Sequence, residues 1–67
     1  MKKTNEFKKI YWLATDKNCE QFIYEQKPKR SNMEWLETTD FHIGKNIFNH
    51  TWEDEPIQVE LVIKPLR

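Results

Sequence analysis

The first apolar stretch of the chain, residues 7–15, places hydrophobic side chains on both faces of a strand. Ile10, Trp12 and Ala14 share one face, and Tyr11 and Leu13 share the other. Aromatic and β-branched residues of this kind favour a pleated sheet. Apolar groups on both faces predict a central strand, or a strand with one face covered by another chain.

A turn and a second strand follow directly. In residues 16–19, Asp16 can bond its own backbone and Asn18 tolerates a positive φ angle, which favours a tight turn. Residues 21–25 are again rich in strand-forming side chains, so 7–15 and 21–25 predict a β-hairpin. Pro28 ends the second strand, because proline offers no backbone donor to a ladder.

Two shorter strands are predicted in the middle of the chain. Residues 33–37 favour a third strand with Met33 and Trp35 pointing inward. Residues 41–43 form a short fourth strand that stops at Gly44, the only glycine. Residues 45–50 are compatible with one helical turn at an end of the sheet.

The last segment has the clearest pattern. Every second position carries an aliphatic side chain that a half-buried strand would turn to one face: Ile57, Val59, Leu61 and Ile63. The chain as a whole predicts a mainly β fold, a small antiparallel meander of four to five short strands with at most one short helical turn. We expect a single domain over residues 1–67, with residues 1–6 as a flexible arm.

The amino-acid composition indicates the kind of core and the cellular compartment. The 67 residues include three Trp, four Phe and two Tyr, which suits a compact aromatic core under a charged surface. Cys19 is the only cysteine, so no disulfide is possible within the chain and a reducing compartment is favoured. No apolar run approaches the roughly 20 residues of a membrane span, and no secretion signal is recognisable. We therefore expect a soluble, cytoplasmic protein without membrane partners.

Charge is balanced overall but uneven along the chain. Residues 1–30 carry eight Lys or Arg and four Asp or Glu, whereas residues 31–67 carry three and seven. Such asymmetry can mark a basic nucleic-acid face or an acidic mimic face, or the two halves can lie side by side in the fold and neutralise each other. Neutralisation within the fold is the simpler interpretation.

The sequence contains no constellation typical of catalysis or of cofactor binding. Cys19, His42 and His50 are the only candidate nitrogen and sulfur ligands, one fewer than a structural zinc site needs. A single glycine cannot build a phosphate-binding loop. We therefore predict no catalytic residues, no metal and no cofactor, with both histidines in surface or capping roles.

Several segments carry a resemblance to a known group. Residues 11–18, 22–30 and 51–61, together with Trp35, resemble short uncharacterised proteins of phages and mobile elements of gut bacteria. The segment Trp-Glu-Asp-Glu-Pro at 52–56 is the most specific part. That group usually has glycine at the position of Cys19. The resemblance implies a phage or mobile-element setting and no particular chemistry.

These observations predict a non-enzymatic binding or accessory protein that acts through protein–protein interaction with an unknown partner, a second copy of itself being one option. The candidate interaction surface combines basic, aromatic and acidic residues: Lys27, Lys29, Arg30, Trp35, Trp52, Glu53, Asp54 and Glu55. The alternative is a single-stranded nucleic-acid-binding module. It would use the basic N-terminal half, with Tyr11, Tyr24 or Trp35 as stacking platforms.

Overall fold

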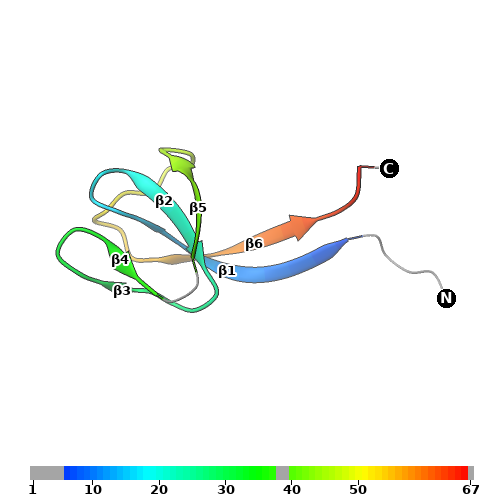
Figure 1. The fold of residues 1–67 in the computed structure, drawn as a ribbon, viewed down its shortest axis with the longest axis horizontal. Helices are drawn as coiled ribbons and strands as arrows, with labels where there is room; N and C mark the ends of the chain where they lie inside the picture. Colours follow the sequence, from blue (N-terminus) through cyan, green and yellow to red (C-terminus); the bar gives the residue numbers. More distant parts are fainter. Residues whose placement is uncertain (1–5, 38–39, 67) are drawn as a thin grey trace.

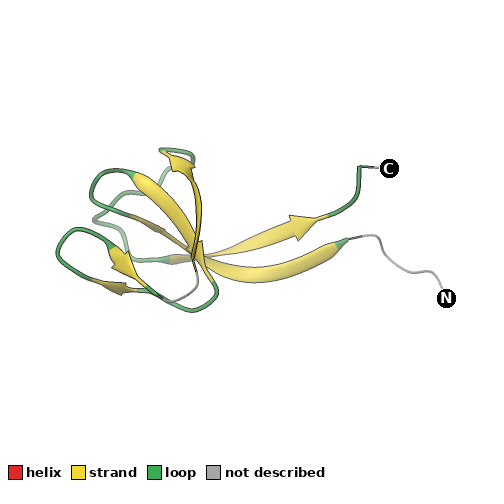
Figure 2. Cartoon of the chain, viewed as in Figure 1, coloured by secondary structure: helices red, strands yellow, loops and turns green. Residues whose placement is uncertain are grey.

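The computed structural model describes residues 6–37 and 40–66, and these residues form six strands and no helix (Figures 1 and 2). In chain order the strands are β1 (Phe7–Thr15), β2 (Glu20–Tyr24), β3 (Lys29–Arg30), β4 (Trp35–Leu36), β5 (Asp40–Lys45) and β6 (Ile57–Ile63). The prediction of a mainly β, antiparallel fold is confirmed. Apart from Glu6, the predicted N-terminal arm lies outside the described residues.

Four strands form one antiparallel sheet in the order β5-β2-β1-β6. The predicted hairpin is present, with Trp12 opposite Tyr24 and Thr15 opposite Gln21. β1 is central, as its two apolar faces predict. The last strand returns to the first and pairs with it as far as Phe7, so the order departs from a simple sequential meander.

The middle of the chain differs most from expectation. β3 and β4 form a separate two-stranded sheet, and the predicted strand 33–37 shrinks to Trp35–Leu36. The inward placement of Met33 is wrong, since its side chain is 65% exposed in the bend before β4. β5 continues through Gly44, because glycine adopts the φ of 141° found there. Residues 46–50 form a loop instead of a helical turn.

One face of the large sheet is covered by the small sheet, and the other is not. On the covered face, Ala14 and Tyr24 pack against Trp35 of the small sheet, and three partly buried rings surround them: Trp12, Phe22 and Trp52. On the opposite face, Tyr11, Leu13 and Ile23 are buried, and Ile43, Val59 and Leu61 of the neighbouring strands pack against them. Among the described residues no strand or helix is layered over this second face, which we call the open face.

The large sheet narrows into a two-stranded ribbon. β2 pairs with β1 only from Trp12 onward, whereas β6 pairs with β1 as far as Phe7. The segments 7–11 and 59–63 therefore have only each other as strand neighbours within the described residues. Figure 1 shows this ribbon extending away from the remaining strands.

Cys19 occupies a backbone conformation that favours glycine. Its φ is 74°, and its N–H donates to the carbonyl of Asp16 at 2.9 Å to close the turn between β1 and β2. A side chain with a Cβ costs roughly 1 kcal/mol in this left-handed region. Replacing Cys19 with glycine is therefore expected to raise the free energy of unfolding by about 0.5–1 kcal/mol in urea titrations.

The matched control for this substitution is Cys19→Ala, which removes the thiol and keeps the Cβ. Its stability should equal that of the native chain, because Cys19 is exposed and unpaired with another cysteine. Equal stability of the glycine and alanine variants would contradict the strained-turn explanation.

Candidate functional site

Three of the residues predicted as an interaction surface lie together. The guanidinium carbon of Arg30 is 4.6 Å from the ring centroid of Trp35 and 4.9 Å from that of Trp52. The two indole rings are 5.9 Å apart and tilted by 60°. Arg30 Nη2 also donates to the carbonyl oxygens of Trp52 at 2.8 Å and Asp54 at 3.3 Å. This cluster ties β3 and β4 to the loop 51–55.

This Arg–Trp cluster stabilises the fold. Trp35 is only 6% exposed, and its Nε1 donates to the carbonyl of Thr15 at 3.0 Å. Trp52 is half-buried and anchors the acidic loop on the covered face, where it packs against the core cluster. A bound protein could therefore reach the edge of Trp52, but Trp35 is part of the core.

The acidic residues of the loop lie at the surface. Asp54 Oδ2 accepts hydrogen bonds from the backbone N–H of Thr51 at 2.9 Å and from its hydroxyl at 3.1 Å. These two bonds lower the pKa of Asp54. Glu53 and Glu55 are exposed. The loop is thus a hydrogen-bonded turn that presents its charges to solvent.

The two lysines of the predicted surface lie on the neighbouring side. Lys27 and Lys29, with Leu36 and Glu37, line a shallow hollow of about 370 Å³. The ammonium group of Lys27 is 5.6 Å from the ring centroid of Trp12. The predicted residues therefore divide into an Arg–Trp cluster, an acidic loop and a basic hollow.

The aromatic platforms proposed for nucleic-acid stacking are not at the surface. Tyr11, Tyr24 and Trp35 are 6%, 1% and 6% exposed. Burial also raises the pKa of Tyr24, with nearby Asp16 adding to the shift. These three rings belong to the core, which leaves only exposed lysines as the nucleic-acid feature of this region.

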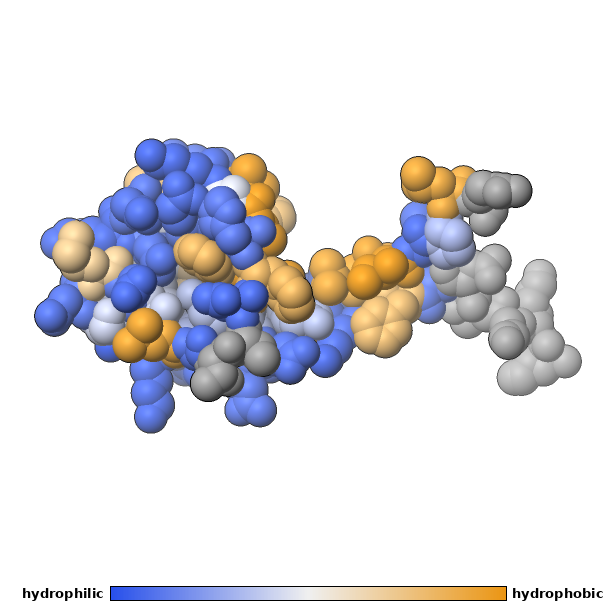
Figure 3. Space-filling model, viewed as in Figure 1, coloured by the Kyte–Doolittle hydropathy of each residue, from blue (hydrophilic) through white to orange (hydrophobic). Residues whose placement is uncertain are grey.

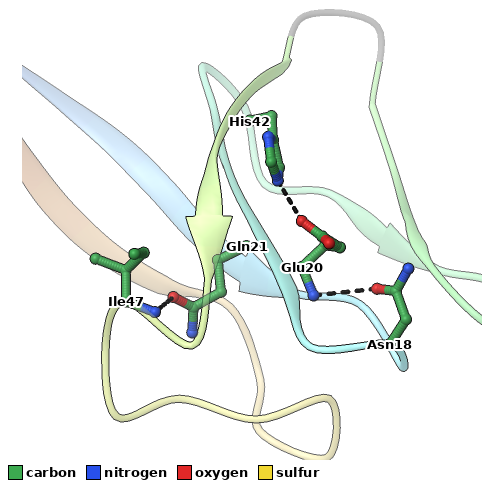
Figure 4. A network of polar contacts seen from close by, with 5 residues as sticks. All are labelled: Asn18, Glu20, Gln21, His42 and Ile47. Carbon is green, nitrogen blue, oxygen red and sulfur yellow. Dashed lines mark hydrogen bonds and ion pairs between the residues drawn. The ribbon is translucent and has the colours of Figure 1, made fainter.

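Both histidines have partners inside the chain. His50 is buried, and its Nε2 donates to the carbonyl of Glu55 at 2.8 Å, since a carbonyl oxygen can only accept. Its Nδ1 lies 2.8 Å from the hydroxyl of Thr15. His42 Nε2 donates to the carboxylate of Glu20 at the surface (Figure 4). Within residues 6–37 and 40–66, no three His, Cys, Asp or Glu side chains are placed to hold a metal.

A buried glutamine positions the loop 46–50. Gln21 is inaccessible to solvent, and its Oε1 accepts the backbone N–H of Ile47 at 2.8 Å (Figure 4). The same oxygen accepts the backbone N–H of Phe48 at 2.9 Å. Its Nε2 donates to the carbonyls of Phe48 and His50. Gly44 completes the fit, since a Cβ there would lie 2.8 Å from the side chain of Ile47. The loop is therefore held beside the open face.

An apolar pocket of about 250 Å³ opens between this loop and the sheet. It is lined by Ile23, Ile43, Ile47, Phe48, Val59, Glu60 and Leu61. Phe41 stands beside it in edge contact with Tyr11, with ring centroids 6.4 Å apart. No charged group other than that of Glu60 lines the pocket in the described part of the chain, so an apolar group is its natural occupant.

Large hydrophobic side chains surround this pocket and continue onto the ribbon. Each is between 46% and 55% exposed: Phe7, Phe41, Ile47, Phe48, Ile57 and Ile63. The register of β1 and β6 places Phe7 opposite Ile63 and on the same face as the buried Leu13. We call these six residues the apolar face. Figure 3 shows apolar surface along the ribbon and beside β5.

Sequence reasoning placed the candidate surface elsewhere. The alternating pattern predicts that the stripe 57–63 is buried on one face, whereas its terminal residues Ile57 and Ile63 are 46% and 55% exposed. The sequence does indicate an exposed apolar surface, because β1 and β6 together contain more apolar residues than one small hairpin can cover. Phe41 and Phe48 could not be assigned to this face without knowing the pairing of β5 with β2.

A buried carboxylate connects the turn after β1 to the small sheet. Asp16 Oδ1 accepts the backbone N–H of Trp35 at 2.9 Å. Burial raises the pKa of Asp16, the hydrogen bond from Trp35 opposes the shift, and the charges of Glu34, Asp40 and Glu20 add to it. Because the native pKa exceeds the unfolded pKa, the native state binds this proton more tightly. This contribution to stability is full below the unfolded pKa and is lost as pH rises through the native pKa.

Replacing Asp16 with asparagine keeps the acceptor oxygen and removes the charge. The variant should therefore gain stability relative to the native chain as the pH rises from about 3 to about 7. Urea unfolding at both pH values measures the difference. Asp16→Ala, which leaves the N–H of Trp35 unpaired, should lose about 1–3 kcal/mol at either pH. If the native chain and Asp16→Asn differ by the same free energy of unfolding at both pH values, the raised pKa of Asp16 is refuted.

Comparisons with known proteins found no relative: no protein-family model, no curated protein sequence and no solved structure matches this chain.

In the part of the chain that the structure describes, no helix has the length and apolar character needed to cross a bilayer.

Proposed function

We propose that this chain is a non-enzymatic binding protein that acts through protein–protein interaction, with the apolar face as its principal contact surface. The supporting observation is the group of half-exposed Phe and Ile side chains around the apolar pocket. Contiguous apolar surface of several hundred Å² is uncommon on a monomer and marks interaction sites. The resemblance to phage and mobile-element proteins adds the proposal that the partner belongs to such an element or its host.

The chemistry of the described surface favours binding over catalysis. The apolar pocket lacks converging polar groups, which substrate orientation would require. His42 donates to Glu20, and His50 is held between Thr15 and Glu55. Each histidine thus stabilises the fold, and neither lines the apolar pocket.

The test is affinity capture with matched variants as baits. Phe48→Glu places a charge on the apolar face, whereas Met33→Glu places one on a comparably exposed apolar residue of the small-sheet loop. A partner held by the apolar face should be retained by the native chain and by Met33→Glu. Phe48→Glu should lose at least about tenfold in affinity, the equivalent of roughly 1.4 kcal/mol. Retention of the same proteins at equal levels by all three baits would exclude the apolar face.

A nucleic-acid function is the second candidate, and the exposed charges of Lys27 and Lys29 favour it. They flank the 370 Å³ hollow and could neutralise phosphates. Binding of single-stranded oligonucleotides should then weaken as salt increases and should fall in a Lys27→Ala, Lys29→Ala variant. Absence of binding at low salt would remove this candidate.

A further inference from the structure

We propose that the apolar face is covered by a second copy of the chain, with the ribbon of each copy lying over the apolar pocket of the other. This inference rests on the proposed function, because it names the partner of the same surface. The first observation that supports it concerns the β1–β6 ribbon. Phe7 and Ile63 are directly opposed at its end, on the face that also bears the pocket, and each is more than half exposed.

The ribbon lacks support of its own. Two isolated strands are marginally stable in water, and independent stability requires a third strand or a layer packed against them. Its outer part, segments 7–10 and 60–63, has no third strand among the described residues, and every residue there except the partly buried Leu61 is exposed. A second chain over the apolar face would supply the missing layer at the ribbon and over the pocket at once.

The available area matches what a dimer needs. Six side chains that are about half exposed each offer on the order of 100 Å² for burial. Together with the pocket walls they approach the roughly 800 Å² per partner of a stable interface. The second copy is also the one partner certain to present an apolar surface of the same size.

Charge selects the arrangement of the two copies. Lys9 lies on the open-face side of the ribbon, two residues from both Phe7 and Tyr11. The Lys9 ammonium pairs with the carboxylate of Glu25 at 3.3 Å, and ribbons stacked in the same direction would press the Lys9–Glu25 pairs of the two copies together in an apolar interface, which costs free energy. Copies running in opposite directions separate these charges and bring Phe7 and Ile63 to the pocket of the partner. Such a two-fold contact is self-complementary and closes as a dimer.

Sedimentation velocity over a dilution series tests the dimer. The native chain should be dimeric at high concentration, and Ile63→Lys should weaken the dimer by at least about tenfold. Val62→Lys is the matched control, because Val62 lies on the other face of the same strand and is 44% exposed. It should remain dimeric. A native chain that is monomeric throughout the series, or equal effects of both lysines, would overturn the inference.

Disulfide trapping tests the opposed arrangement. In a Cys19→Ser background, one chain carries Phe7→Cys and a second carries Phe48→Cys. Oxidation of the mixture should give mainly the mixed disulfide between these two variants. A preference of the Phe7→Cys chain for pairing with an identical copy would contradict the proposal. A monomeric chain that still captures another protein through Phe48 would remove the dimer and leave the proposed function intact.

Discussion

Replacing Trp35 with alanine is expected to lower the free energy of unfolding by about 3–5 kcal/mol, the usual cost of removing a large buried ring. Trp35 joins the two sheets. Its ring packs with Ala14 and Tyr24, and its Nε1 donates to the carbonyl of Thr15. A domain of this size has only several kcal/mol of stability in total. The variant should therefore lose most of its cooperative transition in urea followed by circular dichroism.

Trp35→Phe separates packing from hydrogen bonding. It retains most of the ring and loses the donor to Thr15, so its cost should be smaller, about 1–2 kcal/mol. If the alanine and phenylalanine variants were equally stable, packing by the indole would not be what holds the small sheet in place.

Replacing Gln21 with leucine is expected to cost about 2–4 kcal/mol, because it leaves buried backbone groups without partners. Gln21 bonds Ile47, Phe48 and His50 through their main chains. Its loss should release the loop that forms one wall of the apolar pocket. Backbone amides of Ile47 and Phe48 should exchange with deuterium much faster, and capture through the apolar face should weaken.

Gln58→Leu is the matched control for this substitution. Gln58 is exposed on β6, so the same chemical change there should alter stability by less than about 0.5 kcal/mol. Unchanged amide exchange at Ile47 and Phe48 in Gln21→Leu would show that the loop is held by other contacts.

Local patterns were sufficient to predict most of the large sheet. Period-two alternation indicated β6, and the Asp16–Cys19 turn between two strand-like segments indicated the hairpin of β1 and β2. Apolar residues on both faces of β1 indicated its central position. Each of these features depends on the residues of one segment and its neighbour, so the sequence contains the information directly.

The small sheet and the apolar face depend on long-range packing instead. β3 and β4 are two residues long, and they form because Trp35 packs on β1 and β2 while Arg30 lies against Trp52. Met33 is apolar like Trp35, yet the bend before β4 turns it to solvent. The apolar residues that remain exposed are therefore known only when the β3–β4 hairpin has been placed on one face of the large sheet.

The candidate interaction surface likewise depends on long-range packing that local patterns do not indicate. The sequence predicts Arg30, Trp35 and Trp52 as parts of an interaction surface, whereas in the structure Arg30 lies against both indole rings and the two tryptophans pack within the fold. Sequence reasoning could not foresee that Gln21 would hold Phe48 beside the open face. That placement depends on four hydrogen bonds between one buried side chain and the backbone of a loop far along the chain.

Hydroxyl-radical footprinting of the chain at high dilution tests most directly whether one side of the sheet is left without a cover. Oxidation of each residue would be normalised to that of the denatured chain. Phe41 and Phe48, each 55% exposed, should be oxidised far more than Tyr24 and Trp35, which are 1% and 6% exposed and should be strongly protected. Protection of both phenylalanines to the level of Trp35 at every dilution would mean that the chain covers this face itself, and would contradict the account.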